Sequence, residues 1–330
     1  MPNREGGQVV SYSPRIGVLL PTRGILLSGE GQPDTALVLA MAERAEAIGC
    51  DSVWVGDSLT AKPRLEPLST LAAVASRTQR VRLGTAVLLA ALRQPALLAQ
   101  TAHTLDQLSG GRLTLAMGVG GTFTEGMRRE WAAAGVPPEQ RGKRLEEVVA
   151  LLRAFRQEGP LSFHGRHYQY EGPTMQPRPV QQPCVPLLLA CHHRTGNERQ
   201  YRRAATLADG VMGITDSPLE FAEVVRRVRA YTKDAGRDPA LLQTVFYMTV
   251  NVGEDESQAA READTFLMRY YGVRHWGDAW GPFGGAARIA DRVAEYHEAG
   301  AQTVILRFAS FDQMGQLERL ERDLLHRLGR

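Results

Sequence analysis

Eight short apolar segments alternate along the chain with longer segments that have the apolar spacing of helices, and this alternation is the strongest constraint on the fold. The apolar segments are continuous runs, as expected of parallel strands that are buried on both faces. They cover residues 15–20, 51–57, 81–89, 113–117, 186–191, 209–214, 243–250 and 301–308. Eight strand–helix units in one chain favour a closed (β/α)8 TIM barrel over an open doubly wound sheet.

The segments between the strands predict helices with recognisable ends. Residues 34–48 carry apolar side chains on one face, begin with Asp34 as the expected N-cap and end at Gly49. Residues 141–155 show the same apolar period. Further helices are expected over residues 68–76, 95–108, 197–207, 218–235, 255–271, 287–300 and 313–328.

The alternation is interrupted after the fourth unit. Residues 159–186 are rich in proline and too short to form a domain, so we expect an irregular insertion with a small hairpin over residues 163–170. Residues 1–14 are polar and predict a flexible N-terminal segment. The sequence therefore predicts one barrel domain over residues 15–330, with the insertion inside it.

Composition excludes several classes of protein. Hydrophobic residues make up 43% and charged residues 23%, the values of an ordinary soluble globular protein. The net charge is only +3 and basic residues are scattered, which argues against a nucleic-acid partner. Three cysteines without a pattern indicate a reducing compartment and no structural zinc site. With no secretory signal and no long apolar run, the prediction is a cytoplasmic protein without a membrane partner.

The glycine-rich stretch TLDQLSGGRLTLAMGVGGT, residues 104–122, could be a dinucleotide-binding loop. The fingerprint G-x-G-x-x-G would need a glycine at position 123 after Gly118 and Gly120, but this position is Phe123. The fingerprint fails, and the glycines instead follow a strand that ends in a loop of small residues.

In a barrel of this kind the active site lies at the C-terminal ends of the strands. Asp57 is the only acid that directly follows a strand, so a glycosidase with its two carboxyl groups is not expected. His192 and His193 are adjacent, and their side chains would diverge on an extended strand, which disfavours a shared metal. No lysine or glutamate suited to an aldolase or isomerase ends a strand. We therefore expect a neutral, apolar mouth suited to a flat group that is tethered by a phosphate.

Several motifs occur in the order and spacing of a known family. They are LGTAV, LDQLSGGRLTLAMGVGG, FHGRHYQYEGPTMQPRPVQQPCVPLLLA, LADGVM and RIADRVAEYHEAGAQTVILRF. Over about residues 15 to 325 the chain resembles the bacterial luciferase-like flavin-dependent oxidoreductases. The resemblance implies a barrel that binds reduced FMN or, in one branch, the 8-hydroxy-5-deazaflavin coenzyme, and that acts on a small organic substrate. It also implies a homodimer and, for the FMN branch, a separate flavin reductase as partner.

The resemblance also suggests where a cofactor would bind. A non-prolyl cis peptide in the third strand of the family corresponds to the Ala86–Val87 bond, next to Thr85. The glycines after the fourth strand are interpreted as making room for the ring, although they could simply form a turn. The loop after the fifth strand resembles the phosphate-binding segment. The candidate cofactor residues are Thr85, Ala86, Val87, Gly118, Gly120, Gly121, Cys191, His192, His193, Arg194 and Thr195.

The sequence departs from the family pattern at three places. Many members have a histidine after the acid that ends the second strand, where this chain has Asp57 followed by Ser58. These two are the candidate catalytic residues, although a serine is a poor general base and both could instead be turn or cap residues. Val119 stands where an arginine helps to bind the phosphate in luciferases. The loop after the fifth strand is longer and more basic than usual, which could suit the polyanionic tail of a deazaflavin.

An aromatic-rich segment precedes the last predicted helix. It contains Tyr270, Tyr271, His275, Trp276, Trp280 and Phe283. This segment could form a wall of the substrate pocket, or it could pack under the barrel edge or at a subunit contact.

The sequence thus predicts a flavin-dependent oxidoreductase, with FMN and the deazaflavin both open as cofactors. The alternative is a protein that binds a flavin without turnover, motivated by Ser58 in place of the histidine.

Overall fold

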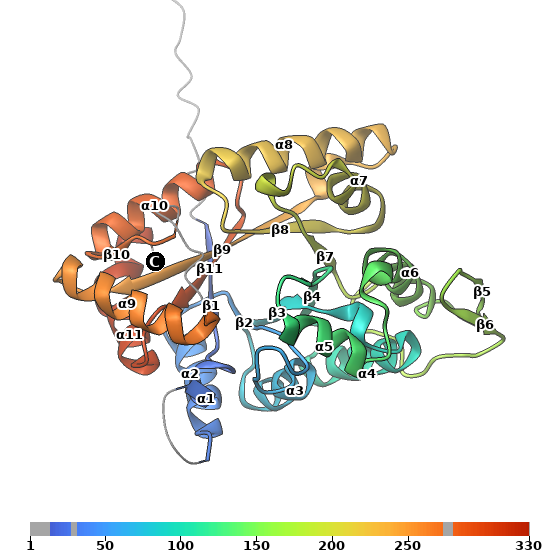
Figure 1. Cartoon of the computed structure of the whole chain (residues 1–330), viewed down its shortest axis with the longest axis horizontal. Helices are drawn as coiled ribbons and strands as arrows, with labels where there is room; N and C mark the ends of the chain where they lie inside the picture. The colour runs from blue at the N-terminus through green and yellow to red at the C-terminus, as the bar shows by residue number, and fades with distance from the viewer. Residues whose placement is uncertain (1–13, 28–31, 273–279, 330) are drawn as a thin grey trace, which may run out of the picture.

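Eight parallel strands close into a barrel in the computed structural model, which describes residues 14–27, 32–272 and 280–329 (Figure 1). The strands, in their order around the ring, are β1 (Arg15–Leu19), β2 (Ser52–Val55), β3 (Arg82–Leu88), β4 (Leu113–Met117), β7 (Leu187–Ala190), β8 (Gly210–Ile214), β9 (Gln243–Val252) and β11 (Thr303–Phe308). Pairing of β9 with β8 and of β11 with β1 closes the ring. The predicted (β/α)8 barrel is confirmed.

Helices surround the strands, with α8 and α10 along the upper edge of Figure 1 and α9 and α11 on its left. They are α2 (Thr35–Ala47), α3 (Pro67–Arg77), α4 (Pro95–Ser109), α6 (Arg141–Ala154), α7 (Glu198–Leu207), α8 (Pro218–Asp234), α9 (Glu256–Tyr271), α10 (Ala286–Glu298) and α11 (Gln313–Arg319). Asp34 caps α2 as predicted, because its side chain accepts a hydrogen bond from the backbone N–H of Leu37.

Some elements differ from the prediction. The sequence pattern missed α1 (Gly24–Leu27) and α5 (Glu125–Ala133). Helix α5 buries little besides Glu130 and Trp131, so it lacks the apolar stripe by which such a helix is recognised. The last helix, predicted to run over 313–328, ends at Arg319 and continues as a π turn and a 3-10 turn to Leu328.

The insertion after β4 contains the predicted hairpin. Strands β5 (Ser162–His164) and β6 (Gln169–Glu171) pair antiparallel and project at the far right of Figure 1, beside α6. Gln181 holds the segment between the hairpin and β7 against the start of β4. Its side-chain amide donates to Asp106 and to the carbonyl of Leu113, both at 2.7 Å. A further short strand, β10 (Phe283–Gly284), extends the sheet beside β9.

One indole ring is packed inside the barrel. Trp54 on β2 is buried among small and apolar side chains of the other strands, and its Nε1 donates to Ser52 Oγ at 2.8 Å. A Cβ on Gly84 of β3 would lie 2.0 Å from the ring, and a Cβ on Gly17 of β1 would lie 2.7 Å from Nε1. The neighbouring strands therefore carry glycine because the ring needs the space.

The described residues contain neither a membrane-spanning helix nor a cluster of metal ligands. None of their helices is long and apolar enough to cross a membrane, and none of their His, Cys, Asp and Glu side chains form a group of three that could hold a metal ion. The predicted flexible N-terminal segment lies outside the described residues, except for Pro14.

The packing around Trp54 predicts a large effect of a small substitution. Gly84→Ala should lower the free energy of unfolding by about 1–3 kcal/mol, because the added methyl overlaps a ring that is enclosed on all sides. Urea denaturation measures the change. Gly126→Ala in α5 is the matched control, since its nearest neighbour is 3.9 Å away, and it should leave stability unchanged or slightly higher. Equal effects of the two variants would contradict this account.

Candidate active site at the mouth of the barrel

The third strand is irregular at its C-terminal end. The peptide bond between Ala86 and Val87 is cis, as the resemblance implies, and the register between β3 and β4 shifts between Thr85 and Leu88. Thr85 is buried, with its hydroxyl donating to the carbonyl of Ala116 at 2.8 Å. Ala86 and Val87 belong instead to the apolar cluster inside the barrel, where Val87 is only partly buried. The irregular segment therefore presents an apolar surface at the mouth.

The glycines after β4 have close protein neighbours. A Cβ on Gly118 would lie 2.7 Å from Val87 Cγ2, and a Cβ on Gly120 would lie 2.7 Å from the ring of Trp131. Gly120 also has a φ of 69°, in the left-handed region. A Cβ on Gly121 would meet Met127 and Phe123 at 3.0 Å. Packing inside the protein thus already requires small residues here, and contact of these glycines with a cofactor stays a prediction.

Asp57 is held in an ion pair at the rim. Its carboxylate accepts hydrogen bonds from Arg93 on both oxygens and from the backbone N–H of Leu89, and its side chain is 1% exposed. Both carboxylate oxygens are therefore occupied. This arrangement fixes the segment after β3 to the end of β2 and does not favour proton exchange with a molecule in the mouth.

Ser58 is likewise engaged in the loop after β2. Its hydroxyl donates to Glu130 at 2.6 Å and accepts from the backbone N–H of Lys62 at 2.8 Å. The same Glu130 oxygen accepts from the backbone N–H groups of Thr60 and Ala61. Ser58 and Glu130 together shape the loop that carries Lys62, and a catalytic role for Ser58 stays a prediction that this bonding does not favour.

The loop after β7 is held by its neighbours through the backbone. The N–H groups of His192 and His193 donate to the side chains of Gln200 and Asp216, at 2.9 and 3.1 Å. The thiol of Cys191 is buried in the layer between strands and helices, where burial raises its pKa to about 12. The Cys191 side chain therefore points away from the mouth, and only its backbone could contact a cofactor there.

The side chains of this loop also have partners. Arg194 is exposed and forms an ion pair with Glu220 of α8. The same carboxylate lies 3.9 Å from Nδ1 of His193. The hydroxyl of Thr195 accepts from Gln200 and donates to the carbonyl of His192. Binding of a phosphate by this loop stays a prediction, and it would require Arg194 to exchange one anion for another.

Arg141, which the sequence analysis did not select, lies beside the glycines after β4. Its Nε is 3.4 Å from the carbonyl of Gly120 and its Nη1 donates to the carbonyl of Pro138 at 2.7 Å. Among the described residues no carboxylate forms an ion pair with it. It opens α6, where Gln140 provides no side-chain cap. The guanidinium is therefore a candidate phosphate ligand near the place where Val119 replaces the arginine of luciferases.

The expectation of a neutral mouth is wrong on the side of β11, β1 and β2. Arg307 on β11 is only 2% exposed, and its Nε and Nη2 donate to Thr249 Oγ1 of β9 at 3.1 and 2.6 Å. Its Nη1 donates to the hydroxyl of Tyr271. The guanidinium carbon lies 5.3 Å from the ring centre of Tyr247 and 5.0 Å from that of Trp280. Arg307 lies near the end of the strand 301–308, so its position at the mouth could be read from the sequence, but its burial among aromatic rings could not.

Three further cations surround the same aromatic side chains. The guanidinium carbons of Arg23 and Arg64 lie 5.1 and 5.9 Å from the ring centre of Tyr270, and the Lys62 ammonium lies 4.7 Å from that of Tyr271. We refer to Arg23, Lys62, Arg64 and Arg307 as the cationic cluster. Burial, with the neighbouring arginines, lowers the pKa of Lys62.

The cationic cluster also acts on Tyr270. Burial by itself would raise the pKa of the Tyr270 hydroxyl, but the positive charges of Arg64, Arg307, Arg23 and Lys62 outweigh it and hold the pKa below its usual value. Two small hollows adjoin this region. Arg23, Tyr270 and Arg307 contribute to one, and Tyr247, Thr249 and Trp280 contribute to the other.

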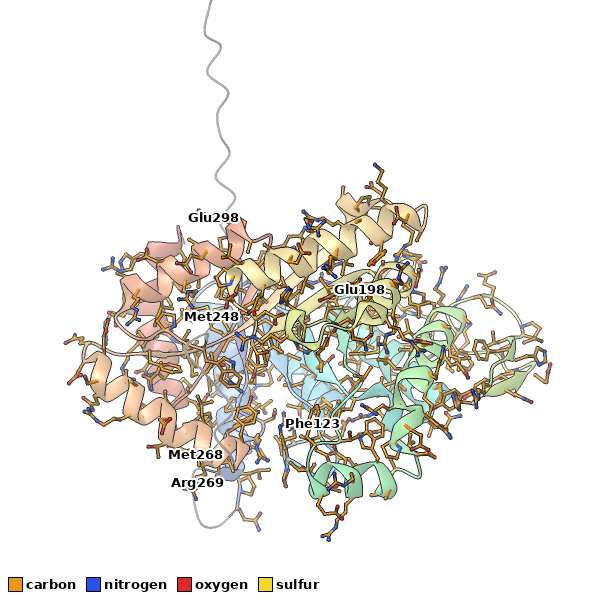
Figure 2. The ribbon with its side chains drawn as sticks, turned by 45° about the horizontal axis from the view of Figure 1, so that its top comes forward. Phe123, Glu198, Met248, Met268, Arg269 and Glu298 are labelled. Atoms are coloured by element: carbon orange, nitrogen blue, oxygen red, sulfur yellow. The ribbon has the colours of Figure 1, made fainter. Side chains whose placement is uncertain are left out.

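The structure also locates the aromatic-rich segment. Tyr270, Tyr271 and Trp280 lie against the cationic cluster, and Figure 2 marks the preceding residues, Met268 and Arg269, near the end of α9. Phe283 lies in β10, whereas His275 and Trp276 lie outside the described residues. Across the mouth, Phe123 is 86% exposed on the loop after β4 (Figure 2).

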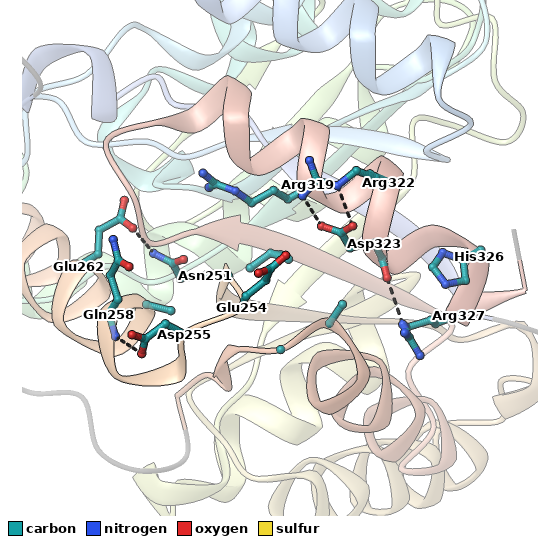
Figure 3. A pocket seen from close by; sticks show the side chains of 15 residues that line it. Asn251, Glu254, Asp255, Gln258, Glu262, Arg319, Arg322, Asp323, His326 and Arg327 are labelled. Atoms are coloured by element: carbon teal, nitrogen blue, oxygen red, sulfur yellow. Dashed lines mark hydrogen bonds and ion pairs between the residues drawn. The ribbon is translucent and has the colours of Figure 1, made fainter.

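A wider pocket lies away from the mouth, beyond the end of β9 and against the C-terminal turns (Figure 3). Its polar groups largely bond to one another: Arg322 pairs with Asp323, Asn251 donates to Glu262, and Asp255 caps α9. Because this pocket carries charges of both signs and lies outside the strand ends at the mouth, it is a weaker candidate site than the mouth.

Comparison with known proteins decides the family. Residues 15–279 match the family described as luciferase-like monooxygenase. The chain belongs to this family. It is 31% identical over 229 residues to the F420-dependent glucose-6-phosphate dehydrogenase of Kineococcus radiotolerans, an alignment that covers 66% of this chain and 64% of that protein.

Solved structures agree on the fold. An F420-dependent secondary alcohol dehydrogenase in complex with an F420–acetone adduct has a TM-score of 0.76 at 19% identity, covering 95% of this chain and 98% of that one. A riboflavin lyase with modified FMN and riboflavin has a TM-score of 0.75 at 16% identity, covering 96% and 91%. At such identities the likeness shows the fold alone.

The buried ion pair at Asp57 predicts a structural effect. Asp57→Asn should lower the free energy of unfolding by about 1–3 kcal/mol, because it removes the buried counter-charge of Arg93 and leaves that guanidinium only the more exposed Glu66. Thermal or urea denaturation measures the change. Glu43→Gln, which removes an exposed ion pair with Arg77, should cost less than about 1 kcal/mol. A wild-type stability for Asp57→Asn would refute the structural role.

The positive field at Tyr270 predicts an unusual titration. The wild-type protein should contain one tyrosine that ionises below the usual pKa of about 10, and Tyr270→Phe should remove that step. Ultraviolet difference absorbance of phenolate against pH measures it. Tyr296→Phe is the control, because burial raises the pKa of Tyr296, and the early step should persist in it. An unchanged curve for Tyr270→Phe would contradict the field.

Proposed function

We propose that the chain is an oxidoreductase that uses reduced FMN together with dioxygen, or a reduced 8-hydroxy-5-deazaflavin, to oxidise or reduce a small organic substrate. The observation that carries the proposal is the irregular end of β3, which places the apolar Ala86–Val87 segment at the mouth of a barrel of this family. A cytoplasmic location, a homodimer and, for FMN, a separate flavin reductase are further parts of the proposal that rest on the resemblance alone.

The residues at the mouth fit a tethered planar cofactor. Ala86, Val87 and Ile214 provide an apolar surface that is not fully buried by the protein itself. Arg141, beside the glycine loop and the start of α6, provides positive charge for a phosphate on the neighbouring side of the barrel. When bound, the cofactor would supply the redox chemistry of the reaction.

The chain itself would contribute position and surroundings. The Asp57–Arg93 pair fixes the segment that follows the irregular end of β3, and the apolar interior would help to exclude water from a bound ring. The nearby hydroxyl with a lowered pKa is that of Tyr270, whereas Asp57 and Ser58 are engaged in structural bonds. Proton transfer, where the reaction needs it, is therefore better assigned to the side of the cationic cluster.

Binding of the cofactor tests this proposal. FMN and the deazaflavin, each reduced and oxidised, are titrated against the protein, and at least one should bind below roughly 100 μM. Arg141→Ala should weaken FMN binding about tenfold or more while leaving riboflavin unchanged, because only FMN has the phosphate. Arg129→Ala, on the exposed face of α5, is the control variant and should bind FMN as the wild type does. No binding of either cofactor would refute the proposal.

A second function is favoured by the bonding of Asp57 and Ser58. A protein that binds a flavin without turnover needs no proton donor at this position, and here both side chains are engaged. Reoxidation of bound reduced FMN separates the two functions. An enzyme of the FMN type accelerates oxygen consumption with its substrate, a deazaflavin enzyme is indifferent to oxygen, and a storage protein leaves reoxidation no faster than in free solution.

A further inference from the structure

We infer that the cationic cluster is the binding site for an oxyanion of the substrate, a carboxylate, sulfonate or phosphate group. This inference rests on the proposed function, because only an enzyme would bind a substrate at this place. It concerns Arg23, Lys62, Arg64 and Arg307, which gather at the ends of β1, β2 and β11.

The cationic cluster has no carboxylate as counter-charge among the described residues. Within the part of the chain that the structure describes, no carboxylate forms a hydrogen bond or ion pair with any of the four cations. Other arginines of the chain do pair, as Arg93 does with Asp57. Burying a charge is costly unless it is paired, yet Arg307 is 2% exposed and its neighbours are also positive. An incoming anion would supply the missing charge.

The aromatic rings do not replace such an anion. Each cation–π contact contributes about 0.5–2 kcal/mol, and the rings of Tyr247, Tyr270, Tyr271 and Trp280 all lie within 5.3 Å of the Arg307 guanidinium carbon. These contacts hold Arg307 in place. No carboxylate of the described residues offsets the mutual repulsion between the four cations.

Donor groups are available for an anion. Arg64 donates through Nε to the carbonyl of Lys62 at 3.1 Å, and neither of its Nη atoms donates to a described residue. Its Nη1 lies 2.1 Å from where a Cβ of Gly56 would be, so the glycine lets the guanidinium extend over the end of β2. The Lys62 ammonium lies above the ring of Tyr271 and offers a second cationic donor. Both groups match the bidentate and point-charge recognition of oxyanions.

The position of the cluster assigns the anion to the substrate and not to the cofactor. In the closed ring, β1 stands opposite β7. The candidate phosphate residues of the cofactor lie in the loop after β7 and at Arg141, beside the glycines that follow β4, whereas the cluster lies on β11 and after β1 and β2. A ring over the end of β3 would stand between the two, with its phosphate on one side and the substrate oxyanion on the other.

The experiment measures anion binding without the cofactor. Sulfate is titrated into the full-length protein at constant ionic strength set with chloride, and tryptophan fluorescence is followed because Trp280 lies 5.0 Å from Arg307. We expect a saturable change in the wild type and at least about tenfold weaker binding in Arg64→Met and in Lys62→Met. Both side chains are only partly buried, so these variants should fold. Arg129→Met, on the exposed face of α5, is the control and should bind as the wild type does.

The outcomes separate the possibilities. Absence of saturable binding, or equal binding in the two variants and the wild type, would overturn the inference. Loss of FMN affinity in Arg64→Met with unchanged riboflavin affinity would assign the cluster to the cofactor phosphate, and would overturn the assignment to the substrate. If sulfate binds as expected but neither FMN nor the deazaflavin binds, the proposed function fails while the anion site stands.

Discussion

Closure of the strand ring is the constraint on which the site depends. The pairing of β11 with β1 joins segments from the two ends of the chain, with Arg15 opposite Thr303. Only this closure brings Arg307 next to the loops that carry Arg23 and Lys62. The interior is filled by Trp54 together with apolar side chains of the other strands, which leaves the mouth as the candidate site. Without the pairing of β11 with β1, these cations would lie at opposite edges of the sheet.

Much of the fold could be read from the sequence because its elements carry strong periodic signals. The strands are buried on both faces, and their continuous apolar runs, such as residues 113–117, place the barrel segments to within a few residues. Helix α5 could not be found in this way, since it is short and packs little more than Glu130 and Trp131. The break at Arg319 carries no proline or glycine, and nothing in the local sequence marks it.

The site was less predictable because its character depends on pairing between distant residues. The position of the Ala86–Val87 segment could be inferred from the resemblance. That Asp57 would be neutralised by Arg93, and Ser58 engaged by Glu130, depends on contacts across 36 and 72 positions of the chain. Counting charged residues along the sequence does not tell which of them remain without a partner after folding.

The mouth is thus divided into two halves with different electrostatic character. On the side of β3 and β4 the surface is apolar and the acid at its rim is paired, which suits a ring that must be kept from water. On the side of β11, β1 and β2 the cations outnumber any described partner, and their field reaches the hydroxyl of Tyr270. A positive field beside a redox cofactor favours negative charge that develops there during the reaction. The cationic cluster that would hold an anionic substrate would therefore also stabilise an anionic transition state. The same four side chains would then serve both substrate binding and catalysis.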